Sequence, residues 1–99
     1  FFNPVEKMRL VEVIYPNQRV LDFVKVIGKE PVLVKDTPLF IVNRIMISYL
    51  KEAEKIVEEG TATKEDVDKA VKLGLNHPIG CFALIDLIGK EVYIKLKNA

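Results

Sequence analysis

The segment 35–50, KDTPLFIVNRIMISYL, decides the fold because an extended stretch gives way to a long helix within it. Asp36 or Thr37 can cap the first amide groups, and Pro38 suits the first helical position, where no N–H is needed. Apolar residues then recur at helical spacing, and they are Ile41, Ile45, Met46, Leu50, Ala53 and Val57. The pattern predicts a buried amphipathic helix over 38–59, ended by Gly60.

One amide side chain interrupts this apolar run. Asn43 lies in the first two turns of the expected helix, with Arg44 beside it. A polar group in such a place must find a partner in the protein, in water or in a ligand. The spacing alone favours a structural amide over a ligand-binding one.

Upstream of the long helix, the sequence predicts a strand, a short helix and a second strand. MRLVEVI at 8–14 is rich in branched residues and carries one acid, Glu12. Asn17 can cap a helix that ends at Gly28, and PVLVK at 31–35 has the character of a strand. Such a βαβ unit predicts two parallel strands with a right-handed crossover. Both strands are apolar on both faces, so further elements outside this unit must cover part of its sheet.

Downstream, two further helices are expected. Thr63 can cap a helix over 64–73 whose inward side carries Val67, Ala70 and Val71, and an apolar helix over 81–88 is closed by Gly89. The tail from 90 to 99 fits a strand by its alternation or the start of a helix. The predicted class is therefore mainly α with a small βαβ element (α+β).

The composition indicates one globular domain and excludes several classes of partner. The 99 residues are 49% hydrophobic and 29% charged, with a net charge of +1. Basic and acidic residues are interspersed, so neither nucleic acid nor an anionic membrane is implied, and no apolar run is long enough to span a bilayer. The cytoplasm is the default location. Cys81 fits a small core residue, and the spacing of Cys and His predicts no metal site.

The single histidine, His77, lies in a loop with Pro78 and Gly80. No acid or metal-ligand spacing accompanies it. We therefore interpret His77 as a loop residue that hydrogen-bonds a helix end, in preference to a catalytic group.

Four motifs in order carry a family resemblance. They are FFNPV at the start, LVEVI at 10–14, TPLFIVNR at 37–44 and LGLNHPIGCFALIDLIG at 73–89. Together they resemble the carboxy-terminal part of NAD-dependent 3-hydroxyacyl-CoA dehydrogenases, which act in fatty-acid β-oxidation. The resemblance implies a helical domain of the 6-phosphogluconate/3-hydroxyacyl-CoA dehydrogenase type, preceded by the last strands of a Rossmann-like sheet. It implies a remnant of the dinucleotide domain at 1–35, a helical substrate and dimerisation domain at 36–99, one compact unit overall, and a helical tail.

The resemblance also implies three catalytic residues. In the family a histidine just before the segment matching FFNP takes the proton of the substrate hydroxyl while hydride leaves for NAD. The acid matching Glu12 pairs with that histidine, Asn43 matches an amide near the acyl carbonyl, and Asn3 matches the Asn of the histidine loop. Taken without the resemblance, Glu12 on a buried strand suggests a site, and a solvent-exposed edge position is the alternative.

The departures from the family pattern shape the expected function. The sequence holds no G-x-G-x-x-G, so no NAD-binding site is visible, and Leu39 stands where the family has Gly. The chain begins with Phe1 after the position of the histidine, and we expect it to belong to something longer and to be inactive alone. We expect a homodimer, in which elements can be exchanged between the two copies. A separate NAD-binding polypeptide is a further expected partner, and the resemblance implies 3-hydroxyacyl-CoA as substrate. A non-catalytic helical oligomerisation module and an acyl-CoA-binding module are the alternatives.

Overall fold

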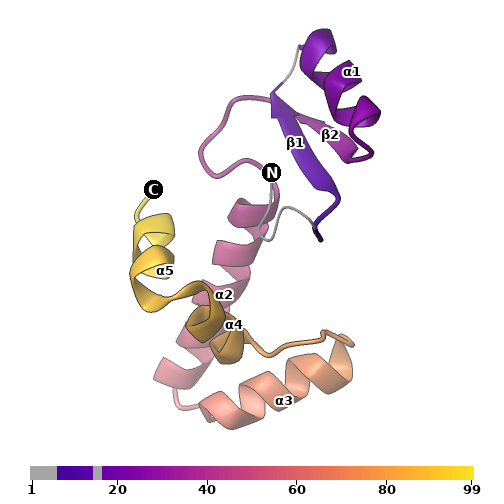
Figure 1. Cartoon of the computed structure of the whole chain (residues 1–99). Coiled ribbons are helices and arrows are strands. Elements are labelled where there is room, and N and C mark those ends of the chain that lie inside the picture. The colour runs from indigo at the N-terminus through magenta and orange to yellow at the C-terminus, as the bar shows by residue number, and fades with distance from the viewer. Residues whose placement is uncertain (1–6, 15–16) are drawn as a thin grey trace. The chain divides into compact units, whose positions relative to one another are not determined.

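The computed structural model of the chain describes residues 7–14 and 17–99. Contacts divide the chain into two compact units, Phe1–Ile41 and Val42–Ala99, and each is described by itself. Strands belong to the first unit and four helices to the second (Figure 1). Their content confirms the predicted class, mainly α with a small βαβ element. The predicted boundary between 35 and 36 stays a prediction.

The first unit is the expected strand, helix and strand. Strand β1 spans Leu10–Ile14, helix α1 spans Gln18–Val26 and strand β2 spans Glu30–Val34. The strands are parallel, with Leu10 opposite Glu30 at one end of the register and Ile14 opposite Val34 at the other. Helix α1 packs against both strands, and the core of this unit is Val11, Val13 and Val24. The parallel pairing confirms the prediction from the sequence.

The ends of α1 follow from local chemistry. The side chain of Asn17 accepts the N–H of Val20 at 3.1 Å, as predicted for a cap. Gly28 follows the helix with φ +80°, a left-handed conformation that costs glycine little. Both predicted boundaries of the short helix are confirmed to within a residue or two.

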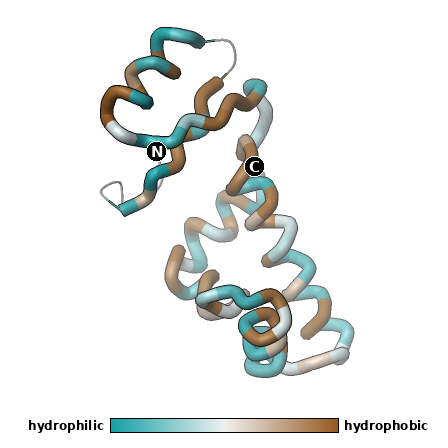
Figure 2. Tube along the Cα trace, turned by 90° about the vertical axis from the view of Figure 1, so that its right-hand side faces the viewer, coloured by the Kyte–Doolittle hydropathy of each residue, from teal (hydrophilic) through white to brown (hydrophobic). Residues whose placement is uncertain are grey.

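The second unit consists of α2 (Val42–Glu58), α3 (Lys64–Gly74), α4 (Cys81–Ile88) and α5 (Lys90–Lys97). Helix α2 packs against the other three. Its hydropathy alternates along its length, as an amphipathic helix requires (Figure 2). The helical tail expected from the resemblance is confirmed as α5. The buried apolar side chains of this unit are Ile47, Leu50, Ala53, Val67, Cys81, Ile85 and Tyr93.

The helix ends of this unit also match the sequence. Gly60 has φ +75° just beyond α2, and Gly89 has φ +92° between α4 and α5. Thr63 caps α3, since its hydroxyl accepts the N–H of Asp66 at 3.2 Å. These three predictions are confirmed.

The predicted start of the long helix at Pro38 is wrong. Helix α2 begins at Val42, because Leu39 and Phe40 have φ angles of 65° and 54°. A right-handed helix cannot continue through two left-handed residues. The Thr37 hydroxyl donates to the carbonyl of Lys35 at 3.3 Å and serves the turn before the helix.

Two predictions of inward-facing residues are also wrong. Ile45 is 66% exposed, whereas Ile47 is 4% exposed, because the buried face of α2 follows residues 47, 50 and 53. Ala70 of α3 is exposed. The inward side of α3 runs from the buried Val67 to the half-buried Val71, one helical turn further on.

Candidate functional site

Glu12 lies in the middle of β1, between the buried Val11 and Val13. Side chains alternate along a strand, so Glu12 points to the face of the sheet opposite the one covered by α1. Its side chain is half-buried. A carboxylate in this position needs hydrogen-bond donors around it.

The backbone supplies one such donor. The N–H of Ile41 donates to Oε1 of Glu12 at 3.2 Å, across 29 residues of sequence. Ile41 ends a turn in which the N–H of Phe40 donates to the carbonyl of Thr37 at 3.2 Å. The left-handed Leu39 and Phe40 form the middle of this turn. The sequence pattern gave no sign of this contact, because it predicted that Ile41 lies inside a helix, where its N–H would bond within the helix.

The other two predicted catalytic residues belong to other segments of the chain. Asn43 is the second residue of α2, half-buried, and belongs to the second unit, whereas Glu12 belongs to the first. Asn3 lies outside the described residues. The catalytic roles of all three stay predictions.

A polar cluster joins α2 to the loop before α4. The hydroxyl of Tyr49 lies 3.0 Å from Nδ1 of His77, with the two rings edge-on at 5.5 Å and 64°. The backbone N–H of His77 donates to the carbonyl of Val71 near the end of α3 at 3.4 Å. This confirms the interpretation of His77 as a loop residue that is hydrogen-bonded to a helix end.

Burial governs the acidity of two groups in this cluster. Burial raises the pKa of the Tyr49 hydroxyl, and a hydrogen bond with Cys81 and the charge of Asp68 act in the same direction. Burial also raises the pKa of the Cys81 thiol, which is 1% exposed. The prediction of Cys81 as a core residue is confirmed, and a thiol held in its neutral form is a poor nucleophile.

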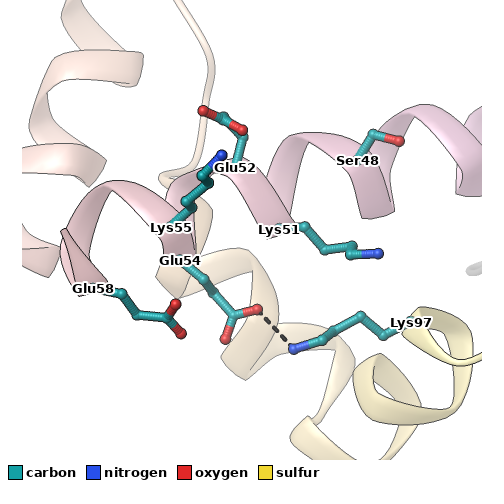
Figure 3. A pocket seen from close by; sticks show the side chains of 7 residues that line it. All are labelled: Ser48, Lys51, Glu52, Glu54, Lys55, Glu58 and Lys97. Atoms are coloured by element: carbon teal, nitrogen blue, oxygen red, sulfur yellow. Dashed lines mark hydrogen bonds and ion pairs between the residues drawn. The ribbon is translucent and has the colours of Figure 1, made fainter.

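An open groove of about 570 Å³ runs between α2 and α5 (Figure 3). Lys97 of α5 contacts Glu54 of α2 there, with 3.0 Å between Nζ and Oε1, and the hydroxyl of Tyr93 donates to the same carboxylate. Burial acts to raise the pKa of Glu54, but these hydrogen bonds and the charges of Lys97 and Lys64 outweigh it and hold that pKa below its ordinary value. The lining residues are Ser48, Lys51, Glu52, Glu54, Lys55, Glu58 and Lys97.

Glu54 of α2 and its partners Tyr93 and Lys97 of α5 link the two helices, and we call these three residues the clamp. The groove is better suited to this link than to binding an anion. Lysine and glutamate are equally numerous in its lining, so their charges cancel. Sequence patterns could not reveal the clamp, because Glu54 is separated by 39 residues from Tyr93 and by 43 from Lys97.

The comparison with known proteins decides the family. Residues 40–98 match the family described as 3-hydroxyacyl-CoA dehydrogenase, C-terminal domain. The chain belongs to this dehydrogenase family. The human mitochondrial hydroxyacyl-coenzyme A dehydrogenase is 50% identical over 98 residues, covering 92% of this chain and 31% of the human protein. The 3-hydroxybutyryl-CoA dehydrogenase of Clostridioides difficile is 47% identical, covering 99% of this chain and 37% of that protein.

The solved structures give the same family. The crystal structure of (S)-3-hydroxybutyryl-CoA dehydrogenase from Ralstonia eutropha matches with a TM-score of 0.90 and 43% identity, over 97% of this chain and 36% of that one. The 3-hydroxybutyryl-CoA dehydrogenase from Escherichia coli matches with a TM-score of 0.89 and 37% identity, over 97% of this chain and 22% of that one. The chain thus spans about a third of the length of the curated relatives it matches.

The described residues do not fit the family's cofactor, NAD. A dinucleotide site needs a glycine-rich turn that leads from a strand to the open N-terminus of a helix. The connection from β1 to α1 has no glycine, and the side chain of Asn17 already takes an amide at the N-terminus of α1.

Within residues 7–14 and 17–99, no group of three His, Cys, Asp or Glu side chains is placed to hold a metal ion. None of the helices in this part of the chain has the length and apolar character needed to cross a membrane.

Proposed function

We propose that this chain is the carboxy-terminal, substrate-side part of an NAD-dependent 3-hydroxyacyl-CoA dehydrogenase of fatty-acid β-oxidation. The family match over residues 40–98 carries the proposal, and the names of the relatives support the substrate class. A dinucleotide-binding region, in the same or a separate polypeptide, provides NAD binding and the catalytic histidine. The chain has no turnover on its own. We keep the cytoplasm as the proposed location, although relatives include mitochondrial enzymes.

Each proposed catalytic residue has a role that suits its chemistry. The carboxylate of Glu12 accepts the N–H of the histidine ring, which fixes the tautomer so that the other nitrogen can take the proton of the substrate hydroxyl. The amide of Asn43 donates to the acyl carbonyl, and Asn3 supports the histidine loop. The half-buried position of Glu12 on β1 and its hydrogen bond with the N–H of Ile41 support its role, because both restrict the orientations of the carboxylate.

The first unit presents a surface suited to the dinucleotide-binding region. Its two strands are parallel, and parallel strands are normally covered on both faces and continued by further strands. Several large apolar side chains of this unit remain exposed, namely Ile14, Phe23, Val26, Val32 and Leu33. Further strands and helices of a dinucleotide domain would cover them.

We also propose that the chain forms a homodimer, with exchange of elements as one arrangement. The helices α4 and α5 expose Leu87, Val92 and Ile94, at 73%, 49% and 53% of their surfaces. A two-fold axis would bring these side chains of two copies together. The same observation supports the second candidate, a helical oligomerisation module without catalysis.

A chimera tests the proposed activity. The amino-terminal region of a relative, ending with its histidine, is fused to Phe1, and NADH formation from 3-hydroxybutyryl-CoA is followed by absorbance. We expect turnover in the fusion and none in the chain alone. Glu12→Gln should lower the rate by roughly 10²-fold or more, since it impairs the base. A folded, dimeric fusion without any turnover would reject the enzyme and favour the oligomerisation module.

Asn43 is tested in the same fusion. Asn43→Ala should lower turnover while leaving the melting temperature nearly unchanged, because the amide acts on the substrate. A steep fall in melting temperature with unaltered turnover would show that Asn43 is a structural amide.

A further inference from the structure

We infer that the backbone amide of Ile41 is a positioning group for the Glu12 carboxylate, and that the left-handed turn at Leu39 and Phe40 aims it. The inference rests on the proposed function, in which Glu12 orients the catalytic base. The main chain is the donor here, so the identity of the Ile41 side chain is not what matters.

The hydrogen bond restricts the rotamers of the Glu12 side chain. Glutamate has several freely rotating bonds, and a strand leaves most of its rotamers open. The N–H of Ile41 reaches Oε1 of Glu12 at 3.2 Å in partly buried surroundings, where a hydrogen bond is stronger than in water. A hydrogen bond to one carboxylate oxygen restrains the side chain, and an imidazole partner requires a restrained carboxylate.

The turn makes this donor available. In a helix that began at Pro38, the N–H of Ile41 would bond to the carbonyl of Thr37. In the structure the N–H of Phe40 takes that carbonyl at 3.2 Å. The N–H of Ile41 is therefore directed to Glu12. The left-handed angles of Leu39 and Phe40, 65° and 54°, produce this change.

These angles are unusual for residues with a side chain. Left-handed conformations cost non-glycine residues free energy, and they cluster at functional sites, where the surroundings maintain them. The same turn immediately precedes α2, in which Asn43 is the second residue. A role of this turn in positioning the Glu12 carboxylate explains its unfavourable backbone angles.

Two matched pairs of variants separate the turn from its side chains. Leu39→Asn keeps a similar size and tolerates the left-handed region, whereas Leu39→Val introduces a β-branched residue that does not. Glu12→Gln keeps an acceptor oxygen, whereas Glu12→Leu removes it. The first member of each pair should keep the Ile41 hydrogen bond, and the second should lose it.

Hydrogen exchange of the Ile41 amide, measured by NMR on the chain itself, tests the hydrogen bond. In wild type and Leu39→Asn the Ile41 amide should exchange with solvent slowly, and in Leu39→Val and Glu12→Leu at least about tenfold faster. If Leu39→Val fails to fold, Glu12→Leu gives the same readout with the turn sequence intact. Equal exchange in wild type and Glu12→Leu would overturn the inference.

Catalytic positioning is read in the fusion described above. Leu39→Val should lower kcat roughly tenfold or more with an unchanged KM for NAD, and Leu39→Asn should not. Because a carboxylate neighbour raises the pKa of an imidazole, Leu39→Val should also move the acidic limb of the rate profile to lower pH. An active wild-type fusion with unchanged kcat and pH profile in Leu39→Val would reject the inference alone. An inactive wild-type fusion would reject the proposed function and the inference with it.

Discussion

Asp68 of α3 holds the start of α4, since its carboxylate accepts the N–H of Phe82 at 2.8 Å and that of Ala83 at 3.1 Å. No side chain of its own caps α4, because the residue before it is Gly80. An acid from another helix thus satisfies amides that a local Ser, Thr or Asp usually satisfies. The negative charge also suits the positive end of the helix dipole.

Removing this acid should destabilise the second unit. Asp68→Ala should lower the free energy of unfolding by about 1–2 kcal/mol, because two amides lose their acceptor, and Asp68→Asn should lower it by less. Urea unfolding monitored by circular dichroism measures both. Asp86→Ala, which removes an exposed acid from α4 itself, is the control and should change stability by less than about 0.5 kcal/mol. Equal effects of the Asp68 and Asp86 changes would contradict the capping role.

Gly80 is required by the closeness of the same acid. A Cβ at position 80 would lie 2.3 Å from both Cβ and Cγ of Asp68, so the side chain of α3 would have to move. Gly80→Ala should therefore cost about 1–3 kcal/mol through overpacking and loss of the cap. Gly74→Ala is the matched control, since nothing lies within 4 Å of its Cβ and alanine favours a helix. Thermal melts that shift equally for both variants would contradict this prediction.

Local signals in the sequence predicted most of the elements. The caps Asn17 and Thr63, the stop signals at Gly28, Gly60 and Gly89, and the apolar periods were sufficient for four helices and two strands, because each depends on neighbours in sequence. The fifth helix, α5, was expected only from the family resemblance. The predicted start of α2 was wrong because it depends on residues that are distant in sequence. Leu39 and Phe40 adopt left-handed angles that their side chains disfavour, and a tertiary contact to Glu12 accompanies them.

The candidate site could be predicted only in part. The resemblance singled out Glu12 and Asn43, and periodicity placed each on its element. The donor to Glu12 is a backbone amide, which carries no sign in the sequence. The partners of Glu54, Tyr93 and Lys97, are likewise distant in sequence, and only the packing of α5 on α2 brings them together.

The only cysteine provides a probe of the core of the second unit. Cys81 is 1% exposed and burial raises its pKa, so little reactive thiolate is present in the native state. At pH 8 an aromatic disulfide reagent should react at least about tenfold more slowly with the native chain than with the chain in guanidinium. Reaction of the native chain at the unfolded rate would show that α4 opens readily. Asp68→Ala should accelerate the native reaction, because it loosens the start of α4.

The clamp at Glu54 should make stability depend on pH in the acidic range. Its pKa is lower in the folded state than in the unfolded state, so the unfolded chain binds the proton more tightly. The resulting stabilisation is complete above the ordinary pKa of about 4.3 and disappears as the pH falls through the lower folded value. Urea unfolding between pH 3 and 7 should show this loss, and Glu54→Gln should weaken it.

Tyr93→Phe isolates the hydroxyl that contributes to the clamp. It removes the hydrogen bond to Glu54 from a side chain that is 3% exposed, and it should lower stability at pH 7 by about 1–2 kcal/mol. The loss should shrink as the pH falls through the lowered pKa of Glu54 in the folded state, because the protonated Glu54 no longer offers a charged acceptor. Tyr49→Phe is the matched control for the loss of a tyrosine hydroxyl at pH 7, since its hydroxyl pairs with His77 and not with Glu54. A pH-independent cost for Tyr93→Phe would mean that Glu54 is not the group that titrates.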